Sequence, residues 1–124
     1  MYEYDWLTPV KDEGSKLLHF IETPLFERLI NELLTYDDYQ KFQAYLLSDP
    51  VAGATISHTG GCRKLRWALP AKGKSGGIRV IYYYLVSRGE IYLLYAYPKS
   101  EQENLTDKQK AVMKHFAQQI EAGK

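Results

Sequence analysis

The sequence has little cysteine and no long apolar segment. Cys62 is the only cysteine among 124 residues, so no disulfide can form within the chain. No stretch approaches the roughly 20 consecutive apolar residues that a membrane span requires. The first 14 residues carry four acids and neither a basic start nor an apolar run, which is unlike a secretory signal. We therefore expect a single cytoplasmic domain over residues 1–124 that does not bind membranes, with residues 1–14 as an N-terminal extension of unassigned role.

Acidic residues are missing from the middle of the chain. Between Val51 and Gly89 there is no Asp or Glu, whereas seven Lys and Arg are present. Residues 1–50 carry ten acidic and four basic residues, a net charge of −6, and residues 51–124 carry five acidic and twelve basic residues, a net charge of +7. A basic segment attracts polyanions, because each cation placed on a phosphate releases a condensed counterion. Pairing between the two oppositely charged halves is the alternative.

The first half of the chain predicts a strand and two helices. The apolar run at 17–22 ends at Thr23 and Pro24, a hydroxyl N-cap followed by proline at the first helical position. The strand should therefore lead directly into a helix. Thr35 resembles the cap of a second helix, whose apolar residues repeat with helical spacing until the Ser-Asp-Pro at 48–50 ends it.

The second half predicts three strands and a C-terminal helix. The strands cover 62–68, 78–86 and 90–97, and a tight turn joins the last two. Thr106 and Gln109 have the spacing of a capping box, which begins the helix. The resulting order is β-α-α-β-β-β-α, with the helices gathered on one face of an antiparallel sheet. This order defines an α+β fold.

Strand alternation predicts a cationic surface. On the strand at 62–68, Lys64 and Arg66 share one face and Arg63 lies on the other. If the register allows it, Arg79 on the next strand joins Lys64 and Arg66. Three like charges repel one another unless a phosphate lies between them, so this face is a candidate anion site.

Two further features extend this candidate surface. The glycine-rich turn before Arg79 carries Lys72 and Lys74, although an ordinary hairpin with solubilising lysines has the same composition. Tyr83 shares the face of Arg79 and could stack on nucleic-acid bases, although core packing is the commoner role of a strand tyrosine.

Other chemistries are excluded by residue type or spacing. The Gly-Lys-Ser at 73–75 is not a nucleotide-binding P-loop, because Ala68 stands where a glycine is needed and a strand follows. His58 and Cys62 are four residues apart, but no second cysteine completes a metal site. No serine or cysteine has an evident base partner. We expect no metal and no cofactor.

The residues that carry a family resemblance are GGCRKLRWALPAKGKSGGIRVIYYY at 60–84 and IYLLYAYPKSEQENLTDKQK at 91–110. Together they resemble the RelE superfamily of type II toxins, and most closely its HigB-like members, over about residues 17–121. The resemblance implies the RelE/ParE-like fold, a metal-independent mRNA endoribonuclease that acts on the ribosome, and inhibition of translation. It also implies a helix-turn-helix, HigA-like antitoxin, through which alone operator DNA is contacted.

The resemblance assigns roles to particular residues. The resemblance points to Lys64, Arg66, Lys72, Lys74, Arg79, Tyr97 and Lys99. We expect Lys64, Arg66, Arg79, Tyr97 and Lys99 to be catalytic, and Arg63, Lys72, Lys74 and Tyr83 to bind RNA or the ribosome. Pro98 departs from the glycine or alanine usual between the last tyrosine and lysine, and it removes a backbone donor.

RNA cleavage by the neighbouring 2′-hydroxyl needs a base, charge stabilisation at the phosphate and a proton for the departing 5′-oxygen. Arginines supply the second requirement. A lysine among other cations gives up its proton more readily, so Lys64, Lys74 and Lys99 are candidate bases. Two other functions stay open: a ParE-like toxin that poisons DNA gyrase, and a non-catalytic RNA-binding module.

Overall fold

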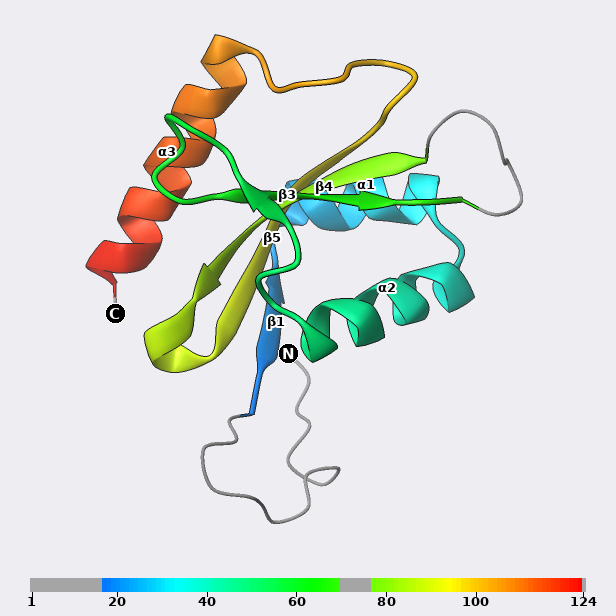
Figure 1. Ribbon diagram of the computed structural model, residues 1–124, viewed down its shortest axis with the longest axis horizontal. Coiled ribbons are helices and arrows are strands. Elements are labelled where there is room, and N and C mark those ends of the chain that lie inside the picture. The colour runs from blue at the N-terminus through cyan, green and yellow to red at the C-terminus, as the bar shows by residue number, and fades with distance from the viewer. Residues whose placement is uncertain (1–16, 70–76, 124) are drawn as a thin grey trace.

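A mixed sheet forms the centre of the fold. The computed structural model describes residues 17–69 and 77–123, and within them five strands are ordered β1-β5-β4-β3-β2 (Figure 1). The strands are β1 (His19–Glu22), β2 (Ala54–Thr55), β3 (Arg63–Trp67), β4 (Ile78–Leu85) and β5 (Glu90–Pro98). The helices are α1 (Pro24–Leu33), α2 (Tyr36–Ser48) and α3 (Asp107–Ala122). A 3₁₀ turn, η2 (Val86–Arg88), joins β4 to β5. The predicted order β-α-α-β-β-β-α is confirmed, and the two-residue strand β2 adds to it.

The helices begin where hydroxyl caps predict them. The Thr23 hydroxyl accepts a hydrogen bond from the backbone N–H of Phe26 at 3.0 Å, and the Thr35 hydroxyl accepts one from Asp38 at 3.1 Å. The capping box at Thr106 forms both of its hydrogen bonds. Each cap satisfies backbone N–H groups that have no partner within the helix, which is worth about 1 kcal/mol.

The helices cover both faces of the sheet, so the prediction that they gather on one face is wrong. Helices α1 and α2 pack on one face and α3 packs on the other (Figure 1). The reason lies in β4, where all but one of the residues from Ile78 to Leu85 are buried. A strand that is apolar on both faces needs a cover on each side. The core under α1 and α2 includes Phe26, Ile30, Phe42, Leu46, Val80 and Tyr82, and the core under α3 includes Cys62, Ile81, Leu94, Met113 and Ala117.

One edge of the sheet departs from the expected antiparallel pattern. Strands β2, β3, β4 and β5 pair antiparallel, but β1 pairs parallel with β5. The His19 N–H donates to the Gly89 carbonyl at 2.9 Å, and the Thr23 N–H donates to that of Leu93 at 3.1 Å. Because β1 and β5 are far apart in sequence, no hairpin dictates their relative direction.

Gly77, the residue before β4, has a conformation that favours glycine. Its φ is +73°, and a Cβ at this position would lie 2.1 Å from the backbone oxygen of Trp67. We expect Gly77→Ala to lower the free energy of unfolding by about 2 kcal/mol or more, because left-handed strain adds to a clash with backbone of β3. Urea unfolding followed by circular dichroism measures this loss.

Gly123→Ala is the matched control for this substitution. Gly123 has a φ of −86°, and its nearest contact for a Cβ is 3.5 Å, to the Gln119 oxygen. We expect a change within about 0.5 kcal/mol. An unfolding midpoint of Gly77→Ala equal to that of Gly123→Ala would show that the start of β4 has a different geometry.

Candidate active site

The register of the central strands brings basic side chains into one row. Arg66 on β3 lies opposite Arg79 on β4, and Arg79 lies opposite Tyr97 on β5. Lys64 pairs with Ile81 in the next row of the same face. Directly opposite residues have Cβ atoms about 4.5–5.5 Å apart. The predicted meeting of Lys64, Arg66 and Arg79 on one sheet surface is therefore present, and we call these three with Lys99 the basic cluster.

The members of this site differ in their exposure to solvent. Arg66 and Lys99 are exposed and Lys64 is partly exposed. Arg79 and Tyr97 are only 3% and 2% exposed. The site therefore has an outer layer of accessible cations above an inner arginine and tyrosine.

The loop that follows β5 covers the inner layer, and we call residues 99–106 the cover loop. The Glu103 carboxylate reaches both Arg79 Nη2, at 3.7 Å, and Lys99 Nζ, at 3.8 Å. Lys64 Nζ donates a hydrogen bond to Asn104 Oδ1 at 2.9 Å. Tyr97 Oη donates to the Glu103 carbonyl at 3.3 Å. The cover loop thus supplies acceptors to the basic cluster and to Tyr97.

The backbone fixes where the cover loop begins. Pro98 is the last residue of β5 and lies opposite Ile78, the first residue of β4. The Lys99 N–H donates to the Gly77 carbonyl at 3.0 Å. This bond holds the start of the cover loop against the start of β4, beside Arg79.

Tyr97 is a neutral hydrogen-bond donor in this environment. Burial raises the pKa of its phenol above 10.0, the nearby Arg79 opposes this rise, and the Glu103 carboxylate adds to it. The phenol therefore keeps its proton at neutral pH. A protonated phenol beside cations can donate a proton or a hydrogen bond but does not serve as a base.

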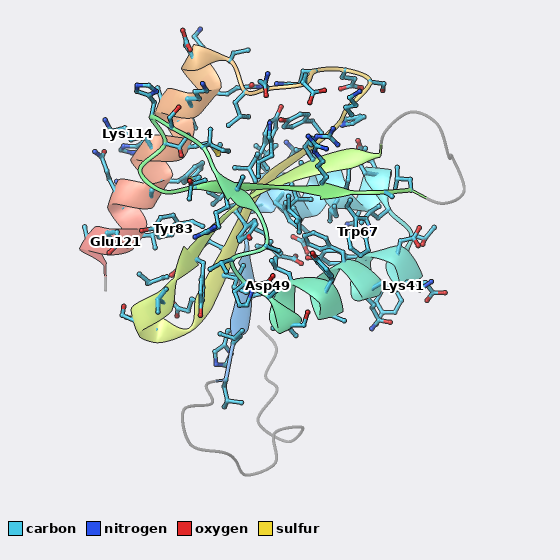
Figure 2. All side chains as sticks on the ribbon, viewed as in Figure 1. Lys41, Asp49, Trp67, Tyr83, Lys114 and Glu121 are labelled. Atoms are coloured by element: carbon cyan, nitrogen blue, oxygen red, sulfur yellow. The ribbon has the colours of Figure 1, made fainter. Side chains whose placement is uncertain are left out.

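Two predicted RNA contacts are not brought to this site. Arg63 faces away from the basic cluster, and its Nη1 donates to the Gly53 carbonyl at 2.7 Å, which holds the loop before β2. Tyr83 is on the expected face but is buried beneath α3, where its hydroxyl donates to the Glu121 carboxylate (Figure 2). As arranged here, neither side chain can contact RNA at the cluster. The predicted contacts Lys72 and Lys74 lie outside the described residues.

Cys62 is a core residue. It is fully buried, and burial raises the pKa of its thiol from 9.0 to about 11, so the reactive thiolate is scarce at neutral pH. Among residues 17–69 and 77–123, no three His, Cys, Asp or Glu side chains lie together in a way that could hold a metal ion.

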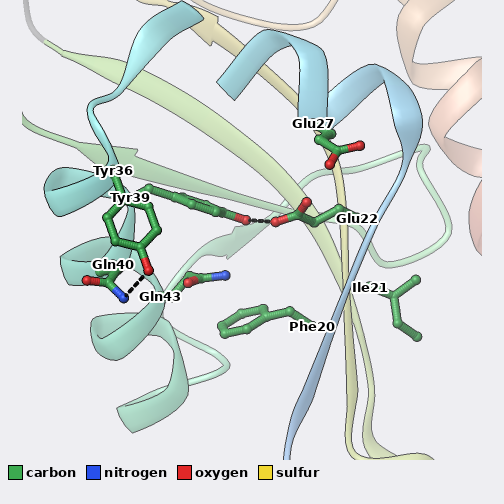
Figure 3. A pocket seen from close by; sticks show the side chains of 8 residues that line it. All are labelled: Phe20, Ile21, Glu22, Glu27, Tyr36, Tyr39, Gln40 and Gln43. Carbon is green, nitrogen blue, oxygen red and sulfur yellow. Dashed lines mark hydrogen bonds between the residues drawn. The ribbon is translucent and has the colours of Figure 1, made fainter. Parts of the chain in front are cut away.

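Two hollows lie away from the basic cluster. One of about 630 Å³ opens between β1 and α2, where Tyr39 donates to the Glu22 carboxylate and Gln40 donates to the Tyr36 hydroxyl at 3.0 Å (Figure 3). The other, of about 420 Å³, lies between β1 and α3. Neither is lined by a residue of the basic cluster. The accessible cations of the cluster thus belong to neither of these two hollows.

Glu103 and Asn104 are site residues that sequence reasoning missed. They lie in a loop without periodicity, so no strand or helix pattern places them on the cationic face. The available signal was the close spacing of two acidic residues, Glu101 and Glu103, directly behind Lys99 in the basic half of the chain.

Together, the row of basic side chains and the three-layer fold define a small α+β protein with a cationic sheet face. A family model described as the RelE toxin of the RelE / RelB toxin–antitoxin system matches residues 52–124. The chain belongs to this RelE toxin family, and it is therefore a toxin of the type II toxin–antitoxin class.

Two solved structures resemble the chain. One is a free-state structure of E. coli toxin RelE with two arginines replaced by alanine; it has 13% sequence identity, a TM-score of 0.52, and coverage of 69% of this chain and 87% of the other. This likeness confirms the fold. A chain of the intact E. coli RelBE toxin–antitoxin complex has 13% identity, a TM-score of 0.49, and coverage of 64% and 93%. None of the described helices is long and apolar enough to cross a membrane.

Proposed function

We propose that this toxin is a HigB-like endoribonuclease that cleaves mRNA during translation, without a metal ion. One observation carries the proposal: Arg66, Arg79 and Tyr97 form a continuous row across three strands, Lys64 is hydrogen-bonded to the cover loop, and Lys99 at the start of that loop pairs with Glu103. This arrangement combines positive charge for a phosphate with a neutral proton donor. Both are required for cleavage of RNA by its own 2′-hydroxyl.

Each requirement of that reaction has a candidate in the row. The 2′-hydroxyl attacks the adjacent phosphorus, and its proton passes to a base, for which Lys64 and Lys99 are the candidates. Arg66 and Arg79 stabilise the charge that grows on the phosphate oxygens. Tyr97 or a protonated lysine supplies the proton that the departing 5′-oxygen takes. The products are a 2′,3′-cyclic phosphate and a 5′-hydroxyl, so the step needs no co-reactant.

Ribosome dependence is supported by where the exposed charge lies. Arg66 and Lys99 are accessible on the surface, whereas Arg79 is not. Residues 51–124 carry the excess positive charge of the chain. Such a surface binds ribosomal and messenger phosphates without reading sequence, so the ribosome, rather than this chain, would align the scissile bond. Translating ribosomes are found in the cytoplasm, so we place the toxin there.

The inhibitory partner that we propose is a helix-turn-helix, HigA-like antitoxin. The matching family model describes a toxin of a toxin–antitoxin system, which supports a partner of that kind. An acidic segment of the antitoxin would cover the basic cluster or hold the cover loop in place. The toxin would then reach operator DNA only through the antitoxin.

The ParE-like and the non-catalytic functions are weaker candidates. A module that only binds phosphates needs cations and no proton donor. Here Tyr97, a buried neutral phenol, lies beside Arg79. The combination of donor and cations favours chemistry over binding alone.

One experiment separates these three functions. The protein is induced in growing cells, and mRNA 5′ ends and plasmid supercoiling are measured in the same culture. New 5′ ends within translated reading frames, with unchanged supercoiling, support the proposal. Altered supercoiling without new 5′ ends supports gyrase poisoning, and neither change supports a binding module.

A further inference from the structure

Glu103 links two cations of the proposed catalytic site. One carboxylate oxygen lies 3.7 Å from Arg79 Nη2 and the other lies 3.8 Å from Lys99 Nζ. A phosphodiester likewise presents two equivalent oxygens to such a pair of cations.

Contacts of the backbone and of neighbouring residues hold Glu103 in position. Its carboxylate, by contrast, makes only weak ion pairs, which another anion can take over. Asn104 is held by Lys64, the Glu103 carbonyl accepts from Tyr97, and Leu105 is buried in the core under α3. The Glu103 side chain itself is 48% exposed, and both of its ion pairs are longer than hydrogen bonds. Ion pairs of this length and exposure are weak, so another anion can take their place.

Arg79 is nearly inaccessible while this carboxylate is in place. Its side chain is 4% exposed. A phosphate that takes over the contact with Arg79 Nη2 must therefore displace the Glu103 carboxylate from it.

We propose that the Glu103 carboxylate occupies the place of the scissile phosphate in the unbound toxin and is displaced when RNA binds. Glu103 is thus a positioning residue: it keeps Arg79 and Lys99 in place before binding and competes with the substrate for them. The inference rests on the proposed ribonuclease function for the identity of the incoming anion.

The test compares Glu103→Gln with Glu101→Gln. Glu101 lies in the same loop, is exposed, and changes the net charge of the protein by the same amount when it is replaced. The first probe is inorganic phosphate, measured as the rise in melting temperature of each protein. The second is a short RNA with 2′-O-methyl groups, which can bind but cannot be cleaved.

We expect Glu103→Gln to bind the 2′-O-methyl RNA about two- to tenfold more tightly than Glu101→Gln does, because one competing anion has been removed. Phosphate should also raise the melting temperature of Glu103→Gln more than that of Glu101→Gln. Circular dichroism confirms that both variants are folded. Equal binding by the two variants, or no response of either to phosphate and RNA, would overturn the proposal.

Cleavage assays separate this proposal from the function on which it rests. If Glu103→Gln binds normally but loses cleavage, Glu103 is the general base and the displacement proposal is wrong. If Glu103→Gln binds more tightly but the unmodified protein cleaves no translated mRNA, the ribonuclease function is wrong and the displacement proposal stands.

Discussion

Replacing Arg79 by alanine is expected to reduce cleavage of translated mRNA by about 100-fold or more. Arg79 lies at the centre of the row, between Arg66 and Tyr97, and its guanidinium is shielded from water. A charge that stabilises the transition state from such an environment is worth more than one in bulk water. Primer extension on mRNA recovered from a translation reaction measures the rate of cutting.

Because Arg79 is buried, the loss must be shown to be catalytic. Circular dichroism and thermal unfolding establish that Arg79→Ala is folded. Arg88→Ala is the control, since Arg88 is an exposed arginine that contacts Glu90 at 3.4 Å and lies outside the basic cluster. We expect Arg88→Ala to cleave like the unmodified protein. A folded Arg79→Ala with the same rate as Arg88→Ala would place the active site elsewhere.

Expression of the chain without an inhibitor is expected to stop bacterial growth. A nuclease that cuts messages during translation removes the templates for all proteins, so incorporation of labelled methionine should fall together with growth. Arg66→Ala should relieve the arrest, because Arg66 is the exposed arginine of the row and its removal leaves the core intact. Growth curves and methionine incorporation after induction measure both effects.

The control for this prediction is Lys114→Ala, which removes an exposed basic residue on α3, away from the basic cluster. It should arrest growth as the unmodified chain does, and immunoblots should show equal amounts of all soluble variants. Unimpaired growth at a confirmed high level of the unmodified, soluble chain would count against the toxin's proposed target.

Local signals in the sequence predicted most of the elements. Thr23, Thr35 and Thr106 cap the three helices as expected, because a hydroxyl N-cap acts on N–H groups only two or three residues away. The placement of α3 could not be predicted in this way. Apolar residues on both sides of β4 require two covers, but periodicity does not say which helix covers which face. The parallel pairing of β1 with β5 also depends on long-range contacts.

The sequence was sufficient to predict the basic residues of the site but not the contacts of the cover loop. Alternation along β3 places Lys64 and Arg66 on one face, and the register then adds Arg79 and Tyr97. The burial of Arg79 and the role of Glu103 follow from the path of the cover loop. That path is set by contacts between residues far apart in the sequence, such as Lys64 with Asn104.

We propose that the sheet face formed by Arg66, Arg79 and Tyr97 cuts mRNA only while the mRNA is being translated. The most direct measurement uses two copies of one transcript, with and without a start codon, in a translation system of purified components to which the toxin is added. Primer extension should reveal cuts within the reading frame of the translated copy and none in the untranslated copy, and Arg79→Ala should abolish them. Equal cutting of both copies, or cutting of neither by folded protein, would contradict the account.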